Sequence, residues 1–167
     1  VIFALGIMPL FEMIFNSVSP LRLVELSQPG HPLLRRLFIE APGTSQHCVM
    51  VGNLAEAGAT AIGANSLIAR VGAYYHDIGK LENPEMFIEN QEGVNPHDKL
   101  SPEESSAIIV SHPEAGLRIA KKYKLPDVIC KLIYEHHGNA SQLYFLRKAQ
   151  EYAKENNLSE PEPKKYM

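Results

Sequence analysis

Helical periodicity runs through most of this sequence, and no stretch alternates apolar and polar residues as a half-buried strand does. Prolines and capping residues divide the helical pattern into short segments. Pro20 and Pro102 each follow a serine, so a capping side chain and a first-turn proline together mark a helix start. Pro113 and Pro126 mark two further starts. We therefore predict an all-α fold, a bundle of six to eight helices.

The predicted helices cover approximately residues 20–26, 32–40, 44–63, 66–77, 101–111, 113–123, 126–137 and 141–156. Residues 41–43 are expected to break the chain, so that Thr44 or Ser45 caps the helix that follows. Pro113 is expected to push His112 out of the helical conformation. Asn65 is expected to cap the helix that begins at Ser66, and Gly79 to end it. Residues 82–100 look mostly irregular, apart from a short helix expected at 84–90.

Composition excludes some functions. The 167 residues suit one domain, and the net charge of −3 gives no reason to expect DNA as a partner. Cys48 and Cys130 show no CxxC spacing, and we interpret them as reduced core residues of a cytosolic domain. Residues 1–15 carry a single charge, on Glu12, but are shorter than the roughly 20 residues that span a bilayer. This segment is either the inner end of a transmembrane helix or a buried amphipathic helix.

The adjacent pair His76-Asp77 is the centre of a predicted metal site. A carboxylate has two oxygens and can bridge two ions, whereas a neutral imidazole gives one nitrogen to one ion. Four further histidines also fall near the ends of predicted helices: His47, His112, His136 and His137. Antiparallel packing of helices 44–63 and 66–77 would bring His47 and His76 to one side. We therefore predict a site for divalent metal ions at one end of the bundle.

Two other histidines have simpler interpretations. His31 follows a turn, and we interpret it as a structural or surface residue. His97 and Asp98 form a second His-Asp pair, but they lie in an irregular segment, which holds ligands less rigidly than a helix does. We interpret this second pair as surface or capping residues, with a position near the active site as the alternative.

The sequence HDIGK at 76–80 resembles the signature of the HD superfamily of metal-dependent phosphohydrolases. Further motifs resemble the cytosolic domain of the bacterial seven-transmembrane HD proteins, namely EAPGTSQH (40–47), VGNLAEA (51–57), VGAYY (71–75), NPHDKLSP (95–102) and EHHG (135–138). The resemblance covers nearly all of residues 1–150. It implies an HD-domain helical bundle.

The resemblance also implies an activity, the hydrolysis of cyclic di-AMP to pApA by a metal-activated hydroxide. It assigns two divalent metal ions, iron or manganese first, with zinc, nickel or magnesium also compatible. The implied metal ligands are His47, His76, Asp77, His112, His136 and His137. Asp77 matches the bridging carboxylate, and Lys80 matches a residue that contacts a substrate phosphate. Asp77 and Lys80 are thus the implied catalytic residues.

The same resemblance divides the chain. Residues 1–18 match the end of a transmembrane or amphipathic helix, residues 19–40 match connector helices, and residues 41–167 match the phosphohydrolase domain. The implied partners are a small-molecule cyclic dinucleotide and, through the N-terminal region, the membrane. The implied location is the cytoplasmic face of the bacterial cell membrane. The sequence predicts no particular oligomeric state.

One departure from the family pattern bears on activity. The pattern ends with another ligand Asp on a later helix, but no Asp follows His137, and Asp98 and Asp127 lie too early. We expect the chain to be truncated at its C-terminus. The first metal would then be held by His47, His76 and Asp77, with a weaker or open remaining position. A catalytically silent sensor of nucleotide or metal, or a phosphohydrolase for another nucleotide, is therefore an alternative. Gly138-Asn139-Ala140 replaces the Gly-Tyr-Pro of the related cyclic di-GMP branch, which disfavours that substrate.

Overall fold

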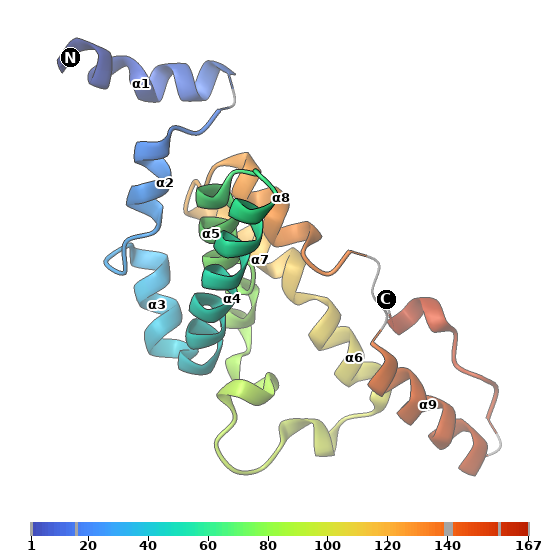
Figure 1. The fold of residues 1–167 in the computed structure, drawn as a ribbon. Coiled ribbons are helices and arrows are strands. Elements are labelled where there is room, and N and C mark those ends of the chain that lie inside the picture. The colour runs from blue at the N-terminus through green and yellow to red at the C-terminus, as the bar shows by residue number, and fades with distance from the viewer. Residues whose placement is uncertain (1, 16, 139–141, 157, 167) are drawn as a thin grey trace.

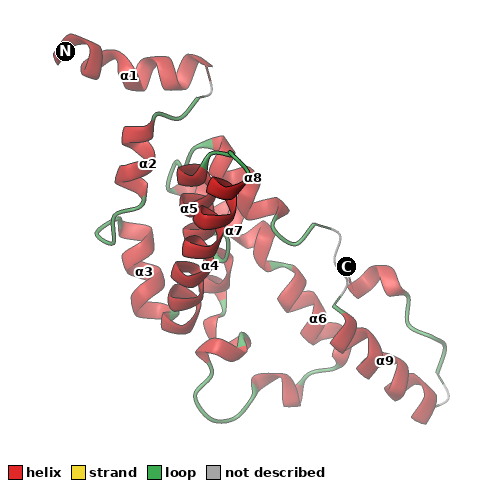
Figure 2. Cartoon of the chain, in the orientation of Figure 1, coloured by secondary structure: helices red, strands yellow, loops and turns green. Residues whose placement is uncertain are grey.

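The computed structural model describes residues 2–15, 17–138, 142–156 and 158–166, which form helices and turns with no strand among them (Figure 2). The prediction of an all-α fold is confirmed. The helices are α1 (Ile2–Phe15), α2 (Pro20–Leu26), α3 (Pro32–Glu40), α4 (Pro42–Ala61), α5 (Ser66–Tyr75), α6 (Pro102–Val110), α7 (His112–Lys122), α8 (Asp127–Glu135) and α9 (Leu143–Glu155). Short 3₁₀ turns also occur, namely η1 (Ile78–Glu82), η2 (Pro84–Met86), η3 (Ile88–Asn90), η4 (Pro96–Lys99) and η5 (Pro163–Tyr166).

Three helix starts form through the side chains that the sequence indicated. The Ser19 hydroxyl accepts a hydrogen bond from the Arg22 amide at the start of α2, and the Asn65 side chain accepts one from the Ile68 amide in α5. Ser101 and Glu104 form a reciprocal capping box at the start of α6. Each bond satisfies an amide that has no partner within its own helix.

Two predicted helix starts were wrong, and in each case proline is the reason. α4 begins at Pro42, so Thr44 lies inside its first turn and caps nothing. α7 begins at His112, with Pro113 directly after it, so His112 stays in the helix. A first-turn proline is tolerated because its missing amide hydrogen would have had no partner there. These errors matter because both Thr44 and His112 face the site described below.

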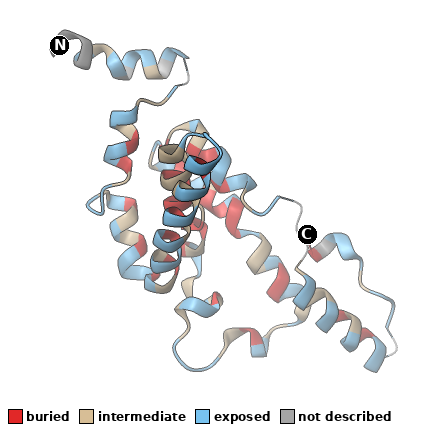
Figure 3. Ribbon diagram, in the orientation of Figure 1, coloured by how far each residue is buried: buried red, intermediate tan, exposed pale blue. Residues whose placement is uncertain are grey.

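The core lies between the antiparallel pair α4 and α5 and the helices packed around them. α7 and α8 pack against this region, and α2 and α3 run along its side (Figures 1 and 3). Tyr75 is fully buried, and its hydroxyl donates a hydrogen bond of 2.7 Å to the Leu26 carbonyl, which ties α5 to α2. α6 extends from this core to α9, and those two helices pack together with η5.

The N-terminal helix α1 presents large apolar side chains to solvent, among them Phe11, Ile14 and Phe15. No helix within the described residues is both long and apolar enough to span a membrane.

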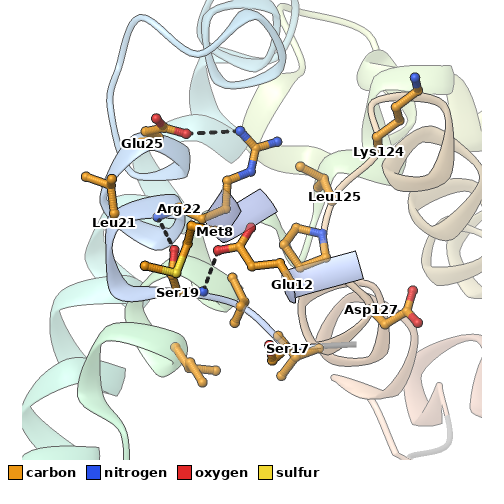
Figure 4. Close-up of a pocket in the computed structure, with 14 residues that line it drawn as sticks. Met8, Glu12, Ser17, Ser19, Leu21, Arg22, Glu25, Lys124, Leu125 and Asp127 are labelled. Atoms are coloured by element: carbon orange, nitrogen blue, oxygen red, sulfur yellow. Dashed lines mark hydrogen bonds and ion pairs between the residues drawn. The ribbon is translucent and has the colours of Figure 1, made fainter. Parts of the chain in front are cut away.

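A cavity of about 930 Å³ separates α1 and α2 from the segment that joins α7 to α8 (Figure 4). Its polar lining includes Glu12, which accepts a hydrogen bond of 2.9 Å from the Ser19 amide. No histidine lines this cavity, so the predicted site lies elsewhere.

Candidate metal centre

The five histidines predicted as ligands converge around Asp77. They come from the start of α4, the end of α5, the start of α7 and the end of α8. Two groups of ligand atoms result, each with its members within 4.8 Å of one another. One group is His47, His76 and Asp77, and the other is His112, His136 and His137.

The α4–α5 pair brings the first group together. His47 lies near the start of α4 and His76 directly follows α5, so antiparallel packing places them at the same end. Their ring centroids are 5.3 Å apart. Gly52 of α4 makes this packing possible, because a Cβ there would lie 2.5 Å from the Tyr74 ring.

A close approach between two glycines brings Asp77 to α7. A Cβ on Gly79 would lie 1.8 Å from the His112 carbonyl oxygen and 2.6 Å from the Gly116 nitrogen. Glycine is therefore required here so that η1 can lie against the first turn of α7. The sequence interpretation of Gly79 as a helix stop was wrong, because the residue has no positive φ and serves this contact instead.

The turn after α8 completes the second group. The Nε2 atoms of His136 and His137 each lie 3.1 Å from Nε2 of His112. α8 packs against both α7 and α5, which places these two rings beside the first group. His136 also lies edge-on to His76, with ring centroids 5.0 Å apart.

Asp77 faces both groups, one oxygen to each. Its Oδ2 lies 3.2 Å from His76 Nε2 and 3.8 Å from His47 Nε2. Its Oδ1 lies 3.2 Å from His112 Nε2 and 3.5 Å from His136 Nε2. The residue is 3% exposed. A buried carboxylate is costly unless it is paired or binds a metal, and Asp77 is paired with these nitrogens and with the Lys80 ammonium.

Backbone carbonyls orient three of the imidazoles in the same way. Nδ1 of His76 lies 2.7 Å from the Ala73 oxygen, and Nδ1 of His136 lies 2.7 Å from the Ile133 oxygen. Nδ1 of His112 is 2.5 Å from the Ile109 oxygen. A carbonyl can only accept, so each Nδ1 carries a hydrogen and each ring turns its Nε2 inward. That Nε2 donates to Asp77 when the ring is protonated and offers a lone pair to a cation when the ring is neutral. In metal-binding histidines, a hydrogen-bond acceptor beside the ring nitrogen that does not bind the metal fixes the tautomer in the same way.

The resulting donor set fits divalent cations. With hydrogens on Nδ1, the Nε2 atoms of His112 and His136 would face each other at 3.1 Å as two acceptors, which is unfavourable unless a cation or a proton lies between them. Atoms that share one ion at about 2.1 Å are separated by roughly 3 to 4 Å, close to the spacing in both groups. Imidazole and carboxylate ligands suit zinc, iron, manganese and nickel alike.

The charges of the cluster agree with this geometry. Burial would raise the pKa of Asp77, but hydrogen bonds from His112, His136 and His76 hold it well below its ordinary value. Burial disfavours the charged form of His76, yet its contacts with Asp77 and Cys48 outweigh this and raise its pKa to about 10. Burial and the neighbouring histidines lower the pKa of His137 to about 4. The carboxylate therefore stays ionised and attracts positive charge.

Lys80 lies beside Asp77 and is also paired with a residue that the sequence did not reveal. Its ammonium donates to Asp77 Oδ2 at 2.9 Å and to Glu89 Oε1 at 2.6 Å. Burial opposes the charge, but the two carboxylates raise the pKa of Lys80. Glu89 lies in η3, within the short helical segment expected at 84–90, but no periodicity or motif connects it with Lys80.

The remaining sequence interpretations have mixed outcomes. His31 is structural, because its Nδ1 accepts from the Leu33 amide at the start of α3 and its ring lies edge-on to Tyr75. The interpretation of His97 as a surface or capping residue was wrong, since it is buried and its Nε2 lies 2.8 Å from the Met86 carbonyl. Cys48 and Cys130 are free and buried, as predicted, and Cys48 Sγ lies 3.7 Å from His76 Nδ1.

An open groove of about 550 Å³ reaches the cluster from the surface. Its lining includes His47, His76 and His136 together with small and apolar side chains of α4, α5 and α8. Its volume falls within the range of about 300–1,000 Å³ that small-molecule sites occupy. The groove therefore gives a ligand access to histidines of both groups.

The chain is similar in sequence to known proteins. Residues 44–162 match the HD domain family. The chain is 51% identical over 148 residues to a cyclic-di-AMP phosphodiesterase, PgpH, of Bacillus subtilis, and 51% identical over 151 residues to PgpH of Listeria monocytogenes. These matches cover 88% and 90% of the chain but only 21% of each relative, so the chain spans about a fifth of their length.

The fold is also similar to a solved structure. The crystal structure of the L. monocytogenes PgpH HD domain in complex with cyclic di-AMP matches with a TM-score of 0.77 and 46% sequence identity. The match covers 84% of this chain and 64% of that one.

Proposed function

The chain belongs to the HD domain family, and on this premise we propose that it is a metal-dependent phosphodiesterase that hydrolyses cyclic di-AMP to linear pApA. The observation that carries the proposal is the position of Asp77, with one oxygen toward each group of histidines. Two relatives bear the name cyclic-di-AMP phosphodiesterase, and a similar HD domain has been crystallised with that nucleotide. These findings support the same substrate class for this chain.

The proposed metal ligands divide between the two groups. His47, His76 and Asp77 Oδ2 would hold one divalent cation. His112, His136 and His137, with Asp77 Oδ1, would hold the other. When bound, such cations supply Lewis acidity at the phosphoryl oxygens and a hydroxide nucleophile near neutral pH. Iron and manganese are our first choices.

The residues of the chain would orient the substrate for this chemistry. The groove beside His47, His76 and His136 is open to solvent, so a phosphodiester can reach the cluster. Lys80 supplies a positive charge at the edge of Asp77, where it can offset charge on a phosphoryl oxygen. In this scheme the bound cations would supply the nucleophile, so no nucleophilic side chain is needed.

We place this activity at the cytoplasmic face of the bacterial membrane. The support is the apolar, solvent-exposed surface of α1, which is typical of a segment that contacts lipid or another apolar partner. In this proposal, residues 1–18 end a membrane region, residues 19–40 connect it to the domain, and residues 41–167 form the phosphohydrolase domain.

The direct test is incubation of the chain, loaded with Mn²⁺ or Fe²⁺, with cyclic di-AMP, followed by chromatography of the products. We expect linear pApA, and no product from the Asp77→Asn variant. Cyclic di-GMP and a deoxynucleoside triphosphate serve as alternative substrates. If metal binds in stoichiometric amount but cyclic di-AMP stays intact, the proposed activity is wrong. Turnover of another nucleotide would instead assign a different HD phosphohydrolase activity.

A further inference from the structure

Glu89 forms a link between the metal centre and the segment that follows it. Its Oε1 accepts a hydrogen bond of 2.6 Å from the Lys80 ammonium, while the same ammonium lies 2.9 Å from Asp77 Oδ2. Lys80 also lies over the Phe87 ring, with its nitrogen 4.9 Å from the ring centroid. Lys80 is thus held between two carboxylates, only one of which belongs to the candidate metal centre.

Contacts with α4 hold Glu89 in place independently of Lys80. The buried Thr44 hydroxyl donates to Glu89 Oε1 at 3.0 Å. Asn90 fixes Thr44 in turn, since its Nδ2 donates to the Thr44 hydroxyl at 2.8 Å and its Oδ1 accepts from the Thr44 amide at 3.0 Å. Gly43 allows this approach, because a Cβ there would lie 1.8 Å from the Glu89 carbonyl oxygen.

The position of Lys80 creates a conflict with a cation. Asp77 Oδ2 is the carboxylate oxygen that faces His47 and His76, and the ammonium occupies the same oxygen. Two positive charges that share one carboxylate oxygen repel each other, and burial strengthens this repulsion. The ammonium must therefore have another anionic partner for Asp77 to bind a cation without a large penalty.

We propose that Glu89 is a positioning residue of the metal centre, which holds the Lys80 ammonium when Asp77 binds a divalent cation. The inference rests on the metal centre of the proposed function but not on the identity of the substrate. Glu89 does not contact the histidines in any described interaction and acts through Lys80. Some residues orient metal ligands without binding the metal themselves, and their replacement typically changes metal affinity by roughly 10- to 100-fold.

The test is a calorimetric titration of the metal-free chain with Mn²⁺ alone. We expect Glu89→Gln to weaken Mn²⁺ affinity by roughly 10- to 100-fold, because Lys80 then has Asp77 as its remaining carboxylate partner. Glu85→Gln is the matched control, since Glu85 is exposed on the same segment and forms no ion pair with any residue that the structure describes. It should bind Mn²⁺ as the parent does. Melting temperatures establish that each variant is folded.

A double-mutant cycle separates this role from simple attraction between Glu89 and the cation. In a Lys80→Met background, Glu89→Gln should change Mn²⁺ affinity by no more than about twofold, which is the usual scatter of independent effects. An equal loss of affinity in both backgrounds would overturn the proposal, as would parental affinity in a folded Glu89→Gln variant.

Thr44 provides a second, milder test. Thr44→Val keeps the shape of the side chain but removes the hydroxyl that holds Glu89, so Mn²⁺ affinity should fall in the same direction. Thr44→Ser retains the hydroxyl and should restore affinity. If both variants bind alike, Glu89 does not depend on Thr44 and the chain of contacts proposed here is wrong. A chain that binds Mn²⁺ with these effects but leaves cyclic di-AMP intact would refute the proposed function alone.

Discussion

Substitution of Gly79 by alanine should damage both the fold and the metal centre. The added Cβ would lie 1.8 Å from the His112 carbonyl oxygen, whereas real Cβ contacts essentially never fall below 3.0 Å. η1 and α7 must therefore separate by at least about 1.2 Å, the difference between those two distances. The obstacles are backbone atoms of His112 and Gly116, so no side-chain rotation can relieve the clash.

The size of the effect follows from this geometry. Overpacking of a core commonly costs 1–3 kcal/mol, and the rigid backbone neighbours place Gly79→Ala near about 3 kcal/mol. For a domain of this size, that loss lowers the melting temperature by roughly 6–12 °C. The same separation moves Asp77 Oδ1 away from His112 Nε2, now 3.2 Å apart. A misplacement of about 1 Å can reduce turnover roughly 100-fold.

Gly58→Ala is the matched control. Gly58 lies in α4 with nothing within 4 Å of an added Cβ, so alanine should raise stability by about 0.5–1 kcal/mol through its better helix propensity. Thermal unfolding followed by circular dichroism measures both variants, and Mn²⁺ titration measures the site. The reasoning is refuted if Gly79→Ala melts no lower than the parent chain or binds Mn²⁺ with the parental affinity.

Three further outcomes are expected. Asp77→Asn should lose both metal ions rather than one, because its two oxygens face different groups of histidines, and elemental analysis of the purified variant measures the stoichiometry. Treatment of the metal-loaded chain with EDTA should lower its stability by about 2.7 kcal/mol if the metal had been present at about 100 times its dissociation constant, a change seen in the melting temperature. Burial and the charge of Arg22 lower the pKa of His31 from 6.5, so its neutral form is favoured in the folded state. Stability should therefore be full above pH 6.5 and fall as the pH drops below it, and His31→Asn, which can still cap α3, should flatten that part of the curve of melting temperature against pH. A parallel curve for His31→Asn would contradict this assignment.

The helices themselves were largely predictable from local sequence. α2 and α3 have the predicted bounds, and the caps at Ser19, Asn65 and Ser101 form as expected. The errors at Thr44 and His112 arose where a proline permits two local outcomes, a break before it or a first turn around it. Packing of α4 and α7 decided between them, because each helix start also makes tertiary contacts.

The candidate ligands were also visible in the sequence. Histidine positions near helix ends predicted a cluster, and the family resemblance grouped His47 and His76 with Asp77. The structure was needed to show that these two face one oxygen of Asp77 while His112 and His136 face the other. Their shared orientation depends on backbone carbonyls of Ala73, Ile109 and Ile133, which carry no side-chain signal.

The sequence by itself determined the helical segments and the types of side chain available for metal binding, because capping and helix propensity act over only a few residues. Tertiary structure decided which oxygen of Asp77 each pair of imidazoles faces, how Gly79 lets Asp77 lie beside α7, and why Glu89 contacts Lys80 nine residues away. These features depend on the distance between separate helices. That distance is set by steric contact between backbones and by burial, which no local pattern of residues records.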